Sequence, residues 1–248
     1  MVDLEKSKII LTRPAEKFSP VNGPHCFEYV DVPLTETIPR SDIHEIMTSI
    51  KNYDPKILVF TSTVGVDIFF SFCRKPNPEY IFVAIGTSTL KRIESHRFHG
   101  VCPEVMDSSG LGRLIFDIQR GNERVALLRS NRSGKELPEL LASGGIDFME
   151  FTLYDILEVK NNKLEDFIMK NKVFGIIVTS SLEASILAKF HREMINDRNI
   201  VLFPIGVPTE RAMISAGFKN LGIKGESNVE MLIHKIEKEN CTNSGEWI

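Results

Sequence analysis

Apolar and polar residues alternate along the chain in short blocks, and one pattern of blocks occurs twice. Residues 59–72 form the first copy and residues 177–190 form the second. In each copy an apolar run ends at a Thr-Ser pair, and apolar residues then recur at the spacing of one helical face. The pattern predicts a buried strand, a tight turn and a helix, and it places Ser62 and Ser180 where a side chain can cap the helix.

The similarity between the two halves extends beyond these copies. Residues 83–86 resemble residues 203–206, and both runs end in glycine. The copies are 118 residues apart at the Thr-Ser pairs and 120 residues apart at the glycines. A weaker match relates residues 114–115 to residues 232–233. We interpret the series as a duplicated α/β unit, the alternative being that buried strands of α/β proteins resemble one another.

Apolar runs of strand length alternate with helix-like segments along the whole chain. The expected strands lie near residues 9–11, 27–30, 57–60, 80–85, 101–104, 125–128, 148–153, 174–178 and 203–206. We expect Ser41 and Ser108 to cap the helices that follow them, and Tyr154 to end a strand. Strands that alternate with helices predict a doubly wound α/β fold of flavodoxin or Rossmann type, with a parallel sheet and helices on both faces.

Composition and charge narrow the class of protein. A hydrophobic fraction of 42% and a charged fraction of 25% are ordinary for a globular protein. No apolar run approaches the length of about 18 residues that a membrane span needs, so we expect no membrane partner. A net charge of −3 gives no electrostatic reason to expect binding to nucleic acid.

The spacing of cysteines and histidines indicates neither a disulfide framework nor a metal site. Cys26, Cys73, Cys102 and Cys241 lie far apart with no Cys-x-x-Cys pair, and the six histidines are scattered. We therefore expect reduced thiols and no bound metal. Residues 1–6 lack the apolar core of a secretion signal. Together these features predict a cytoplasmic protein.

Hydroxyl and basic residues gather where the expected strands end. These ends are residues 12–13, 61–63, 86–89, 129–130, 179–181 and 206–209. The carboxyl ends of parallel strands share one edge of the sheet, where ligands bind. Helix N-termini at that edge offer N–H groups and a partial positive charge, so the pattern favours a ligand with several anionic groups. The alternative is that each serine or threonine only caps its own helix.

Several of these motifs, in their order along the chain, resemble the uroporphyrinogen-III synthase family. The motifs are Leu11-Thr12-Arg13-Pro14, Phe60-Thr61-Ser62, Ile85-Gly86-Thr87-Ser88-Thr89, Tyr154 after Gly144-Gly145, Val178-Thr179-Ser180 and Ile205-Gly206-Val207-Pro208-Thr209. The resemblance covers almost the whole chain. The second glycine turn departs from the Gly-Pro-Thr-Thr-like run of the family, and the first strand-helix unit is short and rich in proline.

The resemblance implies two doubly wound, parallel-sheet domains joined by two extended connectors. The implied boundaries are residues 1–34 with 158–248 for domain one, residues 37–153 for domain two, and about 33–39 and 154–158 for the connectors. Each domain then holds one Thr-Ser copy, and we expect Ser62 and Ser180 to border one cleft between the domains. Two domains that close on a ligand need no partner subunit, so we expect a monomer.

The resemblance also implies a reaction in the biosynthesis of haem and other tetrapyrroles. The family closes the linear tetrapyrrole hydroxymethylbilane to uroporphyrinogen III and needs no cofactor or metal. The terminal hydroxyl leaves, an azafulvene cation forms, and ring D is inverted through a spiro intermediate. The substrate carries eight carboxylates, which suits a site with Arg13, Arg129 and Arg132. A hand-over from hydroxymethylbilane synthase is the partner contact that we expect.

Tyr154 is the residue that the resemblance assigns to catalysis. Loss of hydroxide needs a proton donor, and a phenol can donate a hydrogen bond to the departing hydroxyl. The alternative is a tyrosine that only packs at a domain hinge. The expected substrate-binding residues are Arg13, Thr61, Ser62, Thr63, Gly86, Ser88, Thr89, Arg129, Ser130, Thr179, Ser180, Ser181 and Thr209.

Two other classes of protein fit the same pattern. A hinged two-domain protein could bind an anion or another small molecule without any chemistry. A glycosyltransferase that uses a nucleotide sugar also has two such domains, although we locate no acidic residue or dedicated loop for its ribose. An assay with hydroxymethylbilane would separate both classes from a synthase.

Overall fold

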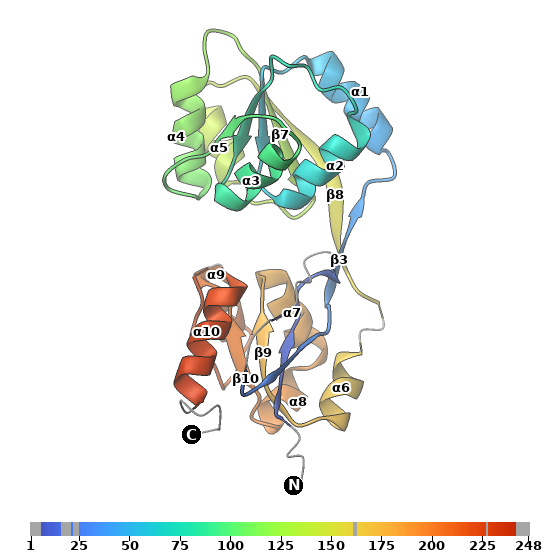
Figure 1. Ribbon diagram of the computed structural model, residues 1–248, viewed down its shortest axis with the longest axis vertical. Helices are drawn as coiled ribbons and strands as arrows, with labels where there is room; N and C mark the ends of the chain where they lie inside the picture. Colours follow the sequence, from blue (N-terminus) through green and yellow to red (C-terminus); the bar gives the residue numbers. More distant parts are fainter. Residues whose placement is uncertain (1–5, 16–20, 22–24, 161–162, 227, 242–248) are drawn as a thin grey trace. The chain divides into compact units, whose positions relative to one another are not determined.

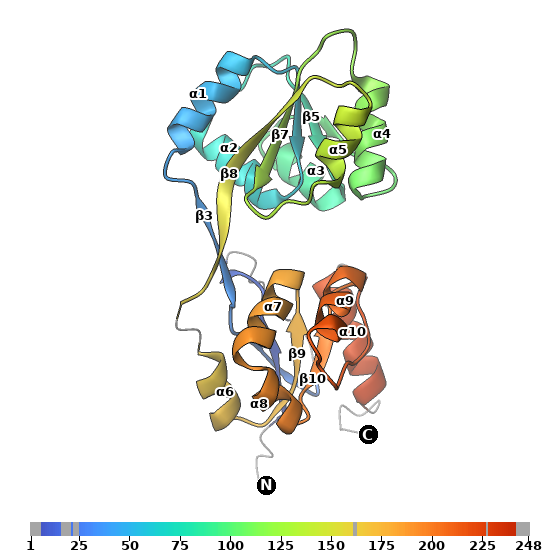
Figure 2. The ribbon, with the colours of Figure 1, turned by 180° about the vertical axis from the view of Figure 1, so that it is seen from behind.

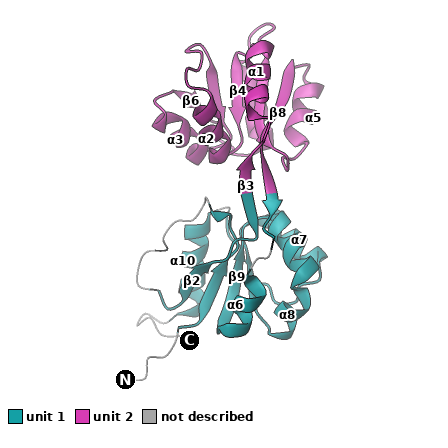
Figure 3. Cartoon of the chain, turned by 90° about the vertical axis from the view of Figure 1, so that its right-hand side faces the viewer, with its two compact units in different colours: residues 1–36, 157–248 teal, residues 37–156 magenta. Residues whose placement is uncertain are grey.

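Two sheets of mainly parallel strands organise the chain, and helices flank each sheet (Figure 1). The computed structural model describes residues 6–15, 21, 25–160, 163–226 and 228–241. The chain divides into two compact units (Figure 3). Unit 1 comprises residues 1–36 and 157–248, and unit 2 comprises residues 37–156. Residues 1–5, on which most of the expectation of no secretion signal rests, lie outside the described residues.

The sheet of unit 1 has the strand order β10-β9-β1-β2, and its neighbouring strands are parallel. Its strands are β1 (Lys8–Leu11), β2 (Glu28–Asp31), β9 (Val173–Val178) and β10 (Val201–Pro204). Its helices are α6 (Leu164–Lys170), α7 (Ser181–Phe190), α8 (Arg192–Asp197), α9 (Val207–Ser215) and α10 (Val229–Asn240). Ile176 and Val178 of β9 pack with α6 to α9, whereas Ile177 packs with α10. Helices therefore cover both faces of this sheet.

The sheet of unit 2 has the order β3-β8-β7-β4-β5-β6. Its strands are β3 (Thr35–Pro39), β4 (Ile57–Phe60), β5 (Ile81–Ala84), β6 (Gly100–Val101), β7 (Val125–Ser130) and β8 (Phe148–Glu158). Its helices are α1 (Ile43–Tyr53), α2 (Thr63–Phe72), α3 (Thr87–Ser95), α4 (Ser108–Ile118) and α5 (Glu136–Ser143). Leu58 and Phe60 pack with α1, α2 and α3, whereas Ile57 and Val59 pack with α4 and α5. This sheet is likewise covered on both faces.

The structure confirms an α/β fold with parallel sheets and alternating strands and helices. It differs from the prediction at β8, the long yellow strand of Figure 2, which continues past Tyr154 to Glu158. β3 is the reason, because the N–H of Arg40 donates to the carbonyl of Leu153 and that of Val159 to the carbonyl of Leu34. These bonds show that β3 runs antiparallel to β8 along the expected connectors.

Two predicted helix caps were one residue away from the observed ones. α1 begins after Asp42 instead of Ser41, and α4 begins after Asp107 instead of Ser108. Asp107 accepts the N–H of Gly110 at 2.8 Å, and an aspartate caps a helix as well as a serine does. Among the described helices, none has both the length and the apolar character required to cross a membrane.

The internal repeat is visible in the sheet order and in burial. The order β8-β7-β4-β5 of unit 2 corresponds to β2-β1-β9-β10 of unit 1. Residues 81–90 and 201–210 have the same sequence of buried and exposed positions, and both segments place a glycine N-cap before a helix. The weaker match of residues 114–115 with 232–233 is shifted by about one helical turn, because the N-caps align Ile115 with Ile236.

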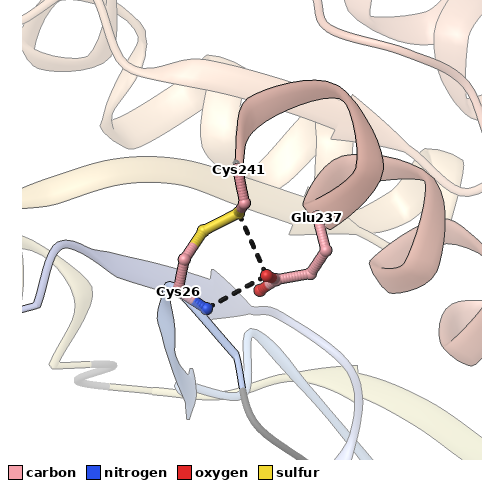
Figure 4. A group of neighbouring side chains, drawn as sticks. All are labelled: Cys26, Glu237 and Cys241. Carbon is pink, nitrogen blue, oxygen red and sulfur yellow. Dashed lines mark hydrogen bonds between the residues drawn. A yellow bond between two sulfur atoms is a disulfide. The ribbon is translucent and has the colours of Figure 1, made fainter. Parts of the chain in front are cut away.

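A disulfide joins Cys26 to Cys241 at the end of α10 (Figure 4). Glu237 lies beside it and accepts the backbone N–H of Cys26 at 3.0 Å and the phenol of Tyr29 at 2.9 Å. The prediction that all thiols are reduced is therefore wrong for this pair, because the fold brings together two cysteines that are 215 residues apart in sequence. Joined sulfurs are not the thiolates that a metal ion prefers, although these two and the Glu237 carboxylate lie within 4.8 Å of one another.

Candidate active site

Ser62 and Tyr154 come from separate parts of unit 2 and meet at the N-terminus of α2. Ser62 follows β4 and caps α2, where its Oγ accepts the N–H of Gly65 at 3.1 Å. Tyr154 lies on β8, with β7 between β8 and β4, and its phenol oxygen is 2.6 Å from the same Oγ. A Cβ at Gly65 would lie 3.7 Å from Cε1 of Tyr154. A side chain larger than alanine there would therefore meet the tyrosine ring.

A β-bulge sets the direction of Tyr154. β7 and β8 pair in register as far as Arg129 and Thr152, but Ser130 then pairs with Tyr154 and skips Leu153. Adjacent residues of a regular strand face opposite sides of the sheet. The bulge instead allows Leu153 and Tyr154 to be buried in one cluster. Tyr154 thus reaches α2 because of this irregularity in strand pairing.

Asn131 holds β8 at the bulge. Its backbone N–H donates to the carbonyl of Tyr154 at 3.1 Å, and its side-chain Oδ1 accepts the N–H of Ile156 at 2.9 Å. The turn that contains Asn131 is closed by Ser130 and Ser133, whose Oγ atoms lie 3.2 Å apart. We had not predicted Asn131 from the sequence, where an asparagine after a strand is an ordinary turn residue.

Arg13 and Arg129 are each paired with a carboxylate of the neighbouring strand. Nε of Arg13 lies 2.7 Å from Oδ1 of Asp31, and Nη1 of Arg129 lies 2.6 Å from Oε2 of Glu150. Arg129 also donates to the carbonyl of Gly134. Both arginines are buried, and a buried cation requires such a partner. Their charges are therefore neutralised inside the unit to which each belongs.

The two ion pairs occupy equivalent positions of the repeat. Asp31 pairs across the sheet with Leu11, and Glu150 pairs with Leu127. The arginine follows two residues after the leucine in each strand. This common geometry indicates a structural role for the pairs, which join β1 to β2 and β7 to β8. Arg132, in contrast, is exposed in the turn after β7.

The expected site residues of α7 surround a carboxylate that we had not predicted. Ser180 caps α7 and accepts the N–H of Glu183 at 3.2 Å, while the N–H of Thr179 donates to Glu183 at 2.8 Å. Burial raises the pKa of Glu183, and hydrogen bonds from Thr12, Thr179 and Ser180 partly oppose that rise. The motif Ser-x-x-Glu is a capping-box pattern, so the sequence did contain a signal for this residue.

The two glycine turns place a threonine at the third position of the following helix. Gly86 precedes α3 and Gly206 precedes α9. Thr89 and Thr209 are buried, whereas Ser88 is exposed. At the first of these turns the N–H of Thr87 donates to Sδ of Met106 at 3.4 Å. Ser88 is therefore accessible to a ligand, and both threonine side chains are covered.

The structure thus joins some of the predicted site residues and separates others. It brings Ser62 and Tyr154 into contact, with Thr61 and Thr63 on either side of Ser62 and half-buried. Thr179, Ser180 and Ser181 belong to unit 1. The expectation that Ser62 and Ser180 border one cleft stays a prediction.

The fold and this site define an α/β protein with a duplicated parallel-sheet unit and a serine–tyrosine pair at the N-terminus of a helix. The family model described as uroporphyrinogen-III synthase HemD matches residues 24–234. The chain therefore belongs to the uroporphyrinogen-III synthase family of enzymes, as its motifs predicted. Comparison with curated proteins gave no match.

Solved structures with the same fold carry the same family name. A uroporphyrinogen-III synthetase from Helicobacter pylori is 17% identical, with a TM-score of 0.68 over 94% of this chain and 100% of that chain. A mutant uroporphyrinogen III synthase from Thermus thermophilus is 15% identical, with a TM-score of 0.63 over 94% of this chain and 98% of that chain. At such low identity the likeness shows the fold alone.

Proposed function

We propose that the chain converts hydroxymethylbilane to uroporphyrinogen III, with inversion of ring D and loss of water. The observation that carries this proposal is the hydrogen-bonded pair of Ser62 and Tyr154 in a chain of this family. The terminal carbon–oxygen bond breaks, and attack on the substituted carbon of ring D forms a carbon–carbon bond and the spiro intermediate. The original bridge bond to that carbon then breaks and re-forms at the free carbon of ring D, whose proton leaves with the hydroxide as one water. No net oxidation or reduction occurs, so the reaction balances without a redox partner.

Tyr154 acts as the proton donor to the departing hydroxyl. Oγ of Ser62 already accepts the N–H of Gly65, and a serine hydroxyl has one further lone pair and its own hydrogen. When Ser62 donates this hydrogen to the phenol oxygen, the phenol hydrogen is directed away from Ser62 and toward the substrate. Such a donor is most effective when its position is fixed, and the bulge with Asn131 supplies that support.

Substrate carboxylates bind where strands end and helices begin. α2, α3 and α9 start there, and the N–H groups and macrodipole of a helix N-terminus favour anions. Thr61, Thr63 and Ser88 add hydroxyl donors, and the exposed Arg132 adds a cation. Arg13 and Arg129 stabilise these strand ends through their ion pairs and make no direct contact with the substrate.

We further propose that residues 1–34 with 158–248 and residues 37–153 act as two domains. The two compact units, whose boundaries differ from these by a few residues, support that assignment. Each domain contributes the carboxyl end of its sheet to substrate binding. The enzyme works as a cytoplasmic monomer and receives its substrate from hydroxymethylbilane synthase.

The purified protein can be tested directly with freshly made hydroxymethylbilane. Products are oxidised to porphyrins, and the type I and type III isomers are separated by chromatography. We expect the type III isomer with the protein and the type I isomer from spontaneous closure in its absence. If the protein yields only the type I isomer, the proposed function is wrong. A binding assay with uroporphyrin would then show whether an anion-binding protein remains.

A further inference from the structure

Glu183 is a buried acid whose partners come from three separate segments of unit 1. It occupies the third position of α7, and only 1% of its surface is exposed. Thr12 follows β1, Thr35 begins β3, and Thr179 follows β9. We propose that Glu183 is an internal anion that fills the N-terminus of α7 and, through these three threonines, positions the ends of β1 and β9 and the start of β3 beside the unit 1 part of the active site.

The hydrogen bonds around Glu183 are all directed at its two carboxylate oxygens. Oγ1 of Thr12 lies 2.5 Å from Oε2, and the N–H of Thr179 donates to the same oxygen at 2.8 Å. Oγ1 of Thr179 lies 2.9 Å from Oε1, and Oγ1 of Thr35 lies 3.4 Å from it. A carboxylate only accepts hydrogen bonds. Its two oxygens can therefore fix the orientation of several hydroxyl groups at once, whereas the amide of a glutamine has only one accepting oxygen.

The equivalent position of unit 2 has no such carboxylate. In the repeat, Gly65 corresponds to Glu183, because each N–H is the one bonded by the capping serine. At α2 the glycine leaves room for Tyr154 beside Ser62. At α7 the protein's own carboxylate takes the place that an anionic ligand would otherwise occupy. The two copies of the motif have thus diverged into an open helix N-terminus and a filled one.

The contacts of Glu183 give a different role to residues that the motifs assigned to substrate binding. Thr179 uses its hydroxyl and its N–H on Glu183, and Ser180 uses its Oγ to cap α7. These residues position the strand ends and the start of β3, and they do not hold a substrate carboxylate. Unit 1 then binds substrate mainly through the N-terminus of α9. The role of Glu183 in activity rests on the proposed function, whereas its place at the N-terminus of α7 does not.

Three variants test the inference: Glu183→Gly, which introduces the residue found at α2, Glu183→Gln, which keeps the shape, and Glu183→Asp. Glu230→Gln is the matched control, since Glu230 is an exposed first-turn acid of α10. Thermal unfolding is measured in sodium acetate and in sodium chloride of equal ionic strength. We expect acetate to raise the melting temperature of Glu183→Gly and to leave the wild type and the control unchanged.

Turnover provides the second measurement. We expect a loss of about 10- to 100-fold in kcat for Glu183→Gln and Glu183→Gly, a smaller loss for Glu183→Asp, and partial recovery of Glu183→Gly in acetate. If Glu183→Gly does not fold, Glu183→Gln decides, and wild-type kcat and melting temperature in that variant would overturn the inference. Folded Glu183→Gly without an acetate effect would also overturn it. Failure of the proposed function is a separate result, namely no type III product from the wild type.

Discussion

The phenol oxygen of Tyr154 lies 2.6 Å from Oγ of Ser62, although the two residues are separated by β7 in the sheet. Tyr154→Phe removes this hydrogen bond and the proposed proton donor but keeps the buried ring. We expect kcat to fall at least about tenfold without abolishing activity, because general acid catalysis contributes only part of the rate. The measurement is the initial rate of type III formation.

Tyr53→Phe is the control for loss of a phenol in unit 2. Its hydroxyl donates to Asp147 at 2.9 Å in an exposed position, so its removal should leave kcat unchanged. Unchanged turnover in Tyr154→Phe would remove Tyr154 from the mechanism and leave it as a packing residue.

Ser62→Ala removes both the helix cap of α2 and the partner of the phenol. Loss of a cap costs about 1 kcal/mol of stability, and Asn228→Ala removes the same kind of cap from α10. We expect similar losses of stability in urea unfolding for the two variants. Only Ser62→Ala should also lower kcat, because only Ser62 contacts Tyr154. Equal kcat in the two variants would show that Ser62 serves only as the cap of α2.

The two arginine–carboxylate pairs should matter more for stability than for substrate binding. Glu150→Gln and Asp31→Asn each replace a carboxylate that contacts a buried guanidinium by a neutral amide, and we expect a loss of about 1 to 3 kcal/mol in urea unfolding. Glu79→Gln is the control, since Glu79 pairs with Lys56 at an exposed position and should cost less than about 1 kcal/mol. A raised KM with unchanged stability would instead assign Arg13 and Arg129 to the substrate.

The fold was largely predictable from local patterns, because alternating apolar strands and helix-spaced residues are properties of neighbours in sequence. The same holds for the serine caps of α2 and α7, where Ser62 and Ser180 bond the N–H three residues later. The extra length of β8 could not be read in this way, since it depends on pairing with β3.

The chemistry of the site was less predictable, because it depends on register and on distant contacts. Arg13 reads as a free cation at a strand end until the pairing of β1 with β2 places Asp31 beside it. Tyr154 reaches Ser62 through a bulge that no local pattern reveals. Glu183 was visible as part of a capping box, but its partners Thr12 and Thr35 lie in segments far away in the sequence.

The disulfide between Cys26 and Cys241 should contribute measurably to stability. It restricts the unfolded chain over 215 residues, and bonds of this kind contribute about 2 to 5 kcal/mol. We expect dithiothreitol to lower the midpoint of urea unfolding of the wild type but not that of the Cys26→Ser, Cys241→Ser double variant. Cys73 and Cys102, which are free thiols, supply the control double variant. Alkylation that finds four thiols without reductant would contradict the pairing.

His191 should make the folded state sensitive to mild acid. It lies between α7 and α8 with 7% of its surface exposed, and neither ring nitrogen has a hydrogen-bond partner among the described residues. Burial lowers the pKa of His191 below its usual value of 6.5, and the charge of Glu165 only partly opposes this. The unfolded state consequently binds the proton first as the pH falls, so stability present above about pH 6.5 is lost below it.

His191→Leu removes this titration from a buried position. We expect urea unfolding to show that the wild type loses stability relative to this variant as the pH falls from about 8 to about 5. Near pH 8 the difference in the free energy of unfolding between the two proteins should be constant. His234→Gln, an exposed position on α10, controls for the loss of one histidine. A difference between wild type and His191→Leu that stays constant over the whole range would show that His191 is protonated equally in the folded and unfolded states.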